Sequence, residues 1–143
     1  MLRASCCFLM LVALLVGCRV VEREGMLPLP ENGAALTYNE MLGRARNQSG
    51  AALDAFYIDS WADLDQAATR LEESAKLLPK TTQIPDAFKT KLPGEADSLR
   101  QDAAKLQEAA RAKNAAQSNE AMQRINQRIR QLRPADKAID EKK

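Results

Sequence analysis

Asp59 and Asp63 are the carboxylates whose spacing best suits chemistry, because residues four apart lie on one face of a helix. Such a pair could chelate Ca²⁺ or work together as an acid and a base. A simpler interpretation is that both residues, together with Asp65, offset the positive dipole end of a helix that starts near Ser60. We favour this second interpretation. The weaker alternative, a weak cation site at Asp59 and Asp63, stays open.

The basic counterpart of this pair is a group of four arginines near the end of the chain: Arg124, Arg128, Arg130 and Arg133. Arg124 and Arg128 share a helical face, and cations near a helix C-terminus interact favourably with the helix dipole. The four arginines form a possible membrane-facing basic pole. Each Lys or Arg near anionic headgroups would contribute at most about 1 kcal/mol of binding. The alternative is an ordinary solvated face.

The chain has no histidine, so it lacks the commonest acid–base group and the commonest metal ligand. It also has no Gly-rich phosphate loop, no Ser/His/Asp set and no HExxH spacing. Met41 and Met122 could offer thioethers to haem or copper, but scattered methionines more often fill gaps in a core. The sequence therefore predicts no enzyme, no cofactor and no metal site. A hydrolase that uses Asp59 and Asp63 is the least favoured alternative.

Residues 1–17 have the pattern of a secretory signal peptide. Arg3 precedes an apolar run of about a dozen residues, from Ala4 to Val16, and no acid occurs before Glu22. The run is shorter than the roughly 20 residues that a membrane-spanning helix needs. An uncleaved anchor is therefore a weaker alternative than a signal that is removed.

The end of this run, Leu15-Val16-Gly17-Cys18, resembles the lipobox of bacterial lipoprotein precursors. In that family the bond before the cysteine is cut, and the cysteine carries a diacylglycerol thioether and an N-acyl chain. The resemblance assigns this lipidation to Cys18. Several acyl chains hold a protein firmly, since each buried CH₂ contributes roughly 0.8 kcal/mol. A secretory signal without lipidation is the alternative.

The identity of residue 19 bears on which membrane would hold the lipid. It is Arg rather than Asp, so the chain lacks the inner-membrane retention signal of enterobacterial lipoproteins. The resemblance therefore favours the outer membrane over the inner one, with the protein facing the periplasm or the exterior.

Four segments follow from the pattern of the whole chain. Residues 1–17 are the signal peptide, and residues 18–35, with two glycines and two prolines, are a lipid-anchored tether. Residues 36–133 are the folded domain, and residues 134–143 are a frayed polar tail. The chain is nearly neutral, with 21 basic and 19 acidic residues, which argues against nucleic acid as a partner.

Apolar residues in the domain recur every three or four positions, which predicts four amphipathic helices. The stripes are Tyr38, Leu42, Ala45, Ser49, Ala52 and Phe56; Trp61, Leu64, Ala68, Leu71, Ala75 and Leu78; Leu92, Ala96, Leu99, Ala103, Leu106 and Ala110; and Ser118, Met122, Ile125, Ile129 and Leu132. Ser60 is the predicted N-cap of the second helix, and Asn114 with Gln117 resembles a capping box before the fourth.

The predicted connections are short, long and short, with the long one at residues 79–91. This order predicts an all-α, antiparallel up-down-up-down four-helix bundle. The alternative is one long helix over residues 37–78 in a coiled-coil oligomer.

This layout resembles the cytochrome c-prime family of periplasmic four-helix bundles. The likeness lies in the helix lengths, the long middle loop and the segment Phe56-Tyr57-Ile58-Asp59-Ser60-Trp61 at the first turn. In that family a Cys-x-x-Cys-His motif near the end of the last helix binds haem. The corresponding residues 124–132 here contain neither cysteine nor histidine. The resemblance therefore implies the fold and argues against the redox chemistry.

Together these features predict a lipid-anchored, cofactor-free helical-bundle lipoprotein of the bacterial cell envelope. Its expected role is structural or protein-interacting, with the membrane and an envelope protein as partners. The alternative is a small-ligand, metal or haem carrier related to cytochrome c-prime-type bundles.

Overall fold

The structure, a computed structural model, describes residues 35–134. The predicted signal peptide, Cys18, the tether up to residue 34 and the tail after Pro134 lie outside the described residues. Within residues 35–134 the regular elements are helices, and no strand occurs there. Thr37 and Thr82 form an isolated parallel β-bridge. The predicted all-α class is confirmed for this part of the chain.

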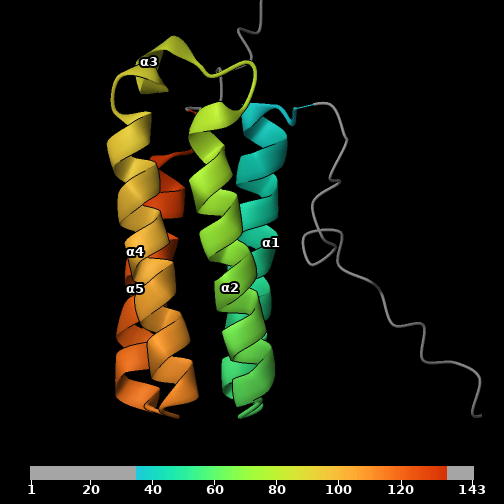
Figure 1. Cartoon of the computed structure of the whole chain (residues 1–143), viewed down its shortest axis with the longest axis vertical. Helices are drawn as coiled ribbons and strands as arrows, with labels where there is room; N and C mark the ends of the chain where they lie inside the picture. The colour runs from blue at the N-terminus through green and yellow to red at the C-terminus, as the bar shows by residue number, and fades with distance from the viewer. Residues whose placement is uncertain (1–34, 135–143) are drawn as a thin grey trace, which may run out of the picture.

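Four long helices form the body of the domain. They are α1 (Tyr38–Tyr57), α2 (Trp61–Leu77), α4 (Leu92–Arg111) and α5 (Ala115–Gln131). Between α2 and α4 lie a 3-10 turn, Leu78–Lys80, and the one-turn helix α3 (Asp86–Lys89). Figure 1 shows the long helices side by side, with the turns after α1 and α4 at one end and α3 at the other.

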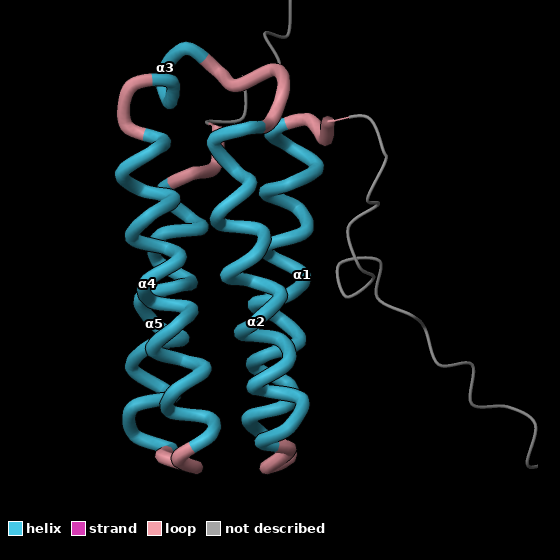
Figure 2. Tube along the Cα trace, in the orientation of Figure 1, coloured by secondary structure: helices cyan, strands magenta, loops and turns pink. Residues whose placement is uncertain are grey.

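Neighbouring long helices pack in a ring. Helix α1 contacts α2 and α5, and α4 contacts the same two helices. The turn between α1 and α2 is only three residues, and Asp59 within it has φ 55°. A left-handed residue cannot continue a right-handed helix. The alternative of one helix over residues 37–78 is therefore wrong, and α1 and α2 form the hairpin seen in Figure 2.

The predicted apolar stripes fill the core. Every stripe residue is buried except Phe56 and Trp61, which are half-buried and pack against the core from the α1–α2 turn. Their rings meet edge to face, with centroids 6.3 Å apart. Small alanines alternate with leucines along α2 and α4, which lets helix axes approach closely.

The helix ends follow the predicted caps only in part. Asn114 caps α5 as predicted, since its Oδ1 accepts a hydrogen bond from Gln117 N at 3.1 Å. At α1, Thr37 and Glu40 form a complete capping box that was not predicted. Ser60 precedes α2 as predicted, but its hydroxyl donates to Asp63 Oδ2 at 2.5 Å and accepts no backbone N–H. Ser60 therefore caps α2 by position without the expected hydrogen bond.

The connection between α2 and α4 is more ordered than the sequence predicted. Phe88 of α3 is buried and stacks on Tyr38, with ring centroids 5.6 Å apart. Lys91 Nζ lies 4.6 Å above the Phe88 ring. The Tyr38 hydroxyl donates to the Leu132 carbonyl at 2.6 Å, which joins the start of α1 to the end of α5. Residues 79–91 were predicted as a plain loop because one helical turn is too short to show periodicity.

Candidate functional site

The predicted acidic pair lies at the α1–α2 turn. Asp59 is exposed in the turn itself, and Asp63 is exposed in the first turn of α2, where it accepts the hydrogen bond from Ser60. Asp65, two residues further along α2, pairs with Arg111 Nε at 3.2 Å. Over residues 35–134 no group of three or more His, Cys, Asp or Glu side chains could hold a metal ion. The weak cation site at Asp59 and Asp63 stays a prediction.

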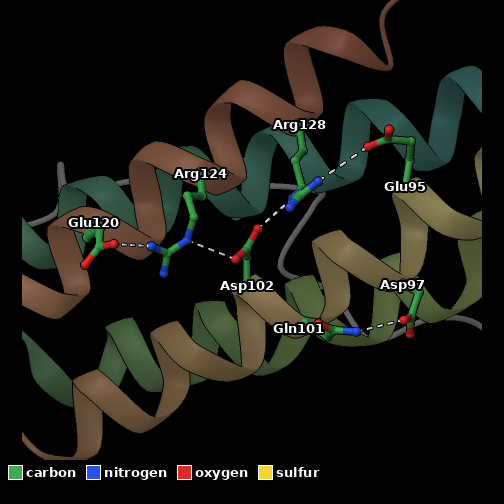
Figure 3. Close-up of polar contacts among 7 residues, drawn as sticks. All are labelled: Glu95, Asp97, Gln101, Asp102, Glu120, Arg124 and Arg128. Atoms are coloured by element: carbon green, nitrogen blue, oxygen red, sulfur yellow. Dashed lines mark hydrogen bonds and ion pairs between the residues drawn. The ribbon is translucent and has the colours of Figure 1, made fainter.

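Two of the four predicted arginines meet a buried carboxylate that the sequence did not single out. Asp102 of α4 is only 3% exposed and receives Arg124 Nε on Oδ1 at 3.0 Å. It also receives Arg128 Nε on Oδ2 at 2.6 Å. The two arginines are one helical turn apart on α5, so a single Asp102 side chain links α4 to two successive turns of α5 (Figure 3).

Two further carboxylates complete this group. Arg124 also pairs with Glu120, and Arg128 Nη1 lies 3.5 Å from Glu95 Oε2. We call Asp102, Arg124, Arg128, Glu95 and Glu120 the α4–α5 ion network; Figure 3 shows their side chains in one row between the two helices. Both oxygens of Asp102 are occupied by guanidinium groups. The geometry therefore suits alignment of two helices better than proton transfer to a ligand.

The sequence contains the signal for this network, although it is weak. Asp102 precedes Ala103 of the third stripe, and Arg124 and Arg128 each precede a stripe isoleucine. All three residues therefore lie at the edges of apolar faces. Pairing them required knowing that α4 lies beside α5 and at which height the helices align, which no local pattern encodes.

The other two predicted arginines lie apart from the network. Arg130 and Arg133 are exposed at and just beyond the end of α5. The charges of Arg124 and Arg128 are offset by carboxylates, so within the predicted basic pole Arg130 and Arg133 are the members left to face solvent. The membrane-facing role of the four arginines stays a prediction.

A polar groove lies beside the network, between α4 and α5. It has a volume of about 240 Å³ and is lined by Lys105, Glu108, Gln117, Glu120 and Arg124. Its two basic side chains, Lys105 and Arg124, are matched by two acidic ones, Glu108 and Glu120. Arg124 is also already paired with Asp102 and Glu120. The groove therefore presents no concentration of one charge that would select an anionic or cationic ligand.

Polar contacts also cross the other helix interfaces. Ser49 of α1 donates to Asn126 Oδ1 of α5 at 2.9 Å, and Gln107 of α4 bonds Thr69 of α2. On the α1–α2 side, burial and then the nearby Arg70 lower the pKa of Arg44, while Glu73 acts in the opposite direction. The two hydrogen bonds, like the ion network, join neighbouring helices.

The two methionines considered as haem or copper ligands belong to the core. Met41 of α1 is 4% exposed and Met122 of α5 is 3% exposed, and both pack with the stripe residues. Their surroundings are those of gap-filling core residues.

The α1–α2 turn carries a feature that the sequence analysis missed. In the described part of the chain, the exposed large apolar residues are Leu53, Tyr57 and Ile58, and all three lie at this turn. Tyr57 is 76% exposed and Ile58 is 72% exposed. Leu53 and Tyr57 fall four apart and off the buried stripe, which is the signal that could have revealed them.

Within residues 35–134, no helix is both long enough and apolar enough to cross a membrane. Comparisons of the chain with protein-family models, with curated proteins and with solved structures found no match. The function is therefore inferred from the chain's own residues and their geometry.

Proposed function

We propose that this protein is a lipid-anchored, cofactor-free lipoprotein of the bacterial cell envelope with a structural or protein-interaction role. The observation that carries the proposal is the sequence Leu15-Val16-Gly17-Cys18 at the end of a short apolar run with a basic start. After cleavage, lipid on Cys18 and residues 19–35 would tether the domain, with the outer membrane favoured.

The domain itself is proposed to be an antiparallel up-down-up-down bundle of the cytochrome c-prime type without haem. Its core is filled by apolar side chains, Met41 and Met122 included, and the most buried carboxylate of residues 35–134, Asp102, is bound by two arginines. Side chains arranged in this way stabilise helix packing and leave the outer surface to make contacts. This supports a binding or structural role over a catalytic one.

The test of the anchor is a detergent partition of the protein expressed in a Gram-negative bacterium, followed by mass spectrometry. We expect the wild-type protein in the detergent phase, cleaved before Cys18 and carrying a diacylglycerol and an N-acyl chain. The matched control is Cys18→Ser, which should enter the aqueous phase without lipid. Wild-type protein that is unmodified and aqueous would contradict the proposal.

The same preparation tests the cofactor-free claim. Visible absorbance and a metal scan of the purified protein should give no haem band and no stoichiometric metal. A Soret band would support the haem-carrier alternative, and a bound metal that is lost in Asp59→Asn with Asp63→Asn would support a cation site at the α1–α2 turn.

A further inference from the structure

Three exposed apolar residues lie close together in the chain at the end of α1 and the turn that follows it. Leu53 and Tyr57 lie four apart on α1, so their side chains share a face, and Ile58 follows directly at the C-cap of that helix. We call Leu53, Tyr57 and Ile58 the apolar tip. Singly scattered apolar residues are normal on protein surfaces, whereas an exposed group of them is a candidate binding surface.

The apolar tip is held in place from beneath. Phe56 packs against the core. Its ring meets those of Trp61 and Tyr57 edge to face, with ring centroids 6.3 Å and 6.0 Å apart. The Ile58 N–H donates to the Asp54 carbonyl, and the Ser60 N–H donates to the Ala55 carbonyl. The backbone beneath these side chains is therefore already ordered before a partner binds, and Tyr offers a large contact area with only two rotatable χ angles.

The charge around the apolar tip is mainly negative. Residues 53–63 contain three carboxylates, Asp54, Asp59 and Asp63, and no Lys or Arg. On the adjacent turn after α4, Arg111 is engaged by Asp65 at 3.2 Å, and Lys113 is the nearby base. An apolar centre with an acidic rim is complementary to an apolar pocket with a basic rim.

The position of the apolar tip suits contact away from the anchor. Helix α1 starts at Tyr38, next to the tether, and its 20 residues span about 30 Å to the turn. Figure 1 shows the turn at the opposite end of the molecule from the start of α1. A lipid-tethered domain would therefore present this end outward while the tether end stays near the membrane.

We propose that the apolar tip is the docking surface for a partner protein that offers an apolar pocket edged with Lys or Arg. This inference rests on the proposed interaction role and names the surface that performs it. A second copy of this chain is a poor occupant, because tip-to-tip contact would bring two sets of three carboxylates together. An anionic membrane is a poor occupant for the same reason.

The test uses the purified mature protein and a displayed library of random peptides. Selected peptides should combine aromatic or aliphatic residues with flanking Lys or Arg. They should bind Tyr57→Ser with Ile58→Ser at least 10-fold more weakly than the wild type. Asp59→Asn with Asp63→Asn should weaken binding less and reduce its dependence on salt, because rim charges act mainly through long-range attraction.

The matched control is Gln123→Ser with Gln127→Ser, two exposed positions on α5, which should leave peptide binding unchanged. Circular dichroism checks that each variant keeps its helices. Three results would overturn the inference: peptides that bind the tip variant as well as the wild type, self-association that depends on Tyr57 and Ile58, or tip-dependent binding to lipid vesicles. Peptides that bind another surface would contradict docking at the apolar tip but not the proposed interaction role. An unmodified Cys18 would contradict only the proposed lipid anchor.

Discussion

Asp102 sits at the centre of the α4–α5 ion network, where its two oxygens each receive a different arginine. Replacing this carboxylate with an amide removes the negative charge between Arg124 and Arg128, so that only Glu120 and Glu95 offset their positive charges. The side chains of these arginines are 34% and 30% exposed, so water relieves part of the penalty. The cost should therefore lie below that of a fully buried pair.

We predict that Asp102→Asn lowers the free energy of unfolding by about 2–3 kcal/mol, measured by urea denaturation. The matched control is Asp97→Asn on the same helix, whose carboxylate is exposed and bonds Arg100 and Gln101. That control should change little, because water screens ion pairs between exposed side chains. Equal losses in both variants would contradict the role given to Asp102.

Tyr38 is a second residue whose environment has a measurable consequence. It is fully buried, and burial raises the pKa of its phenol from 10.0 to about 12. Because the folded state holds the proton more tightly than the unfolded state, the stabilisation from the neutral phenol is complete below pH 10. It is lost as the pH rises toward 12.

We predict that Tyr38→Phe costs about 1 kcal/mol near neutral pH, through loss of the hydrogen bond to Leu132. This difference from the wild type should shrink between pH 10 and 12. Unfolding in urea at several pH values measures it. Tyr57 is the other tyrosine, so Tyr57→Phe leaves Tyr38 as the single phenol for an ultraviolet titration. A pKa near 10 for Tyr38 would contradict the prediction.

At the scale of the helices, Gly50 lies in the interior of α1 and is exposed, and a Cβ built there meets no atom within 4 Å. Glycine costs a helix interior roughly 0.5–1 kcal/mol relative to alanine because its unfolded backbone is freer. We predict that Gly50→Ala raises the free energy of unfolding by about this amount in a thermal or urea melt. Gly50→Pro should lower it by about 3 kcal/mol or more. A destabilising Gly50→Ala would mean that α1 is not a regular helix there.

The helices were predictable to within a few residues, since the stripes in Leu92–Ala110 and Ser118–Leu132 are locally encoded at helical spacing. Helix α3 was missed because Phe88 has no periodic companions, and its burial depends on Tyr38, fifty residues earlier. The α4–α5 ion network was missed for a similar reason: Asp102 and Arg124 meet only after α4 and α5 align. Contacts between distant residues leave no period in the sequence.

At the scale of the whole molecule, charge differs between the two ends. Among residues 35–134, the end where α1 starts carries eight bases and five acids: Arg44, Arg46, Lys76, Lys80, Lys89, Lys91, Arg130 and Arg133, with Glu40, Glu72, Glu73, Asp86 and Glu95. The opposite end carries the acidic rim of the apolar tip. A tethered domain of this kind would turn its basic end toward anionic headgroups.

We predict that unlipidated residues 19–143 bind anionic vesicles weakly and lose that binding as salt rises, because exposed charges are screened. Arg130→Gln with Arg133→Gln should weaken binding in a vesicle sedimentation assay. Arg124→Gln should weaken it less, because that guanidinium is held by Asp102 and Glu120. Equal binding to neutral vesicles would contradict the electrostatic orientation.

The contact between the Tyr38 hydroxyl and the Leu132 carbonyl places the start of α1 beside the end of α5. A short linker could therefore join residue 133 to residue 36, and the chain could be opened instead at the exposed turn around Lys113. Such a circular permutant would keep every helix–helix contact while its new termini emerge beside the apolar tip. A tag or fluorophore fused there would report directly on whatever docks at that end.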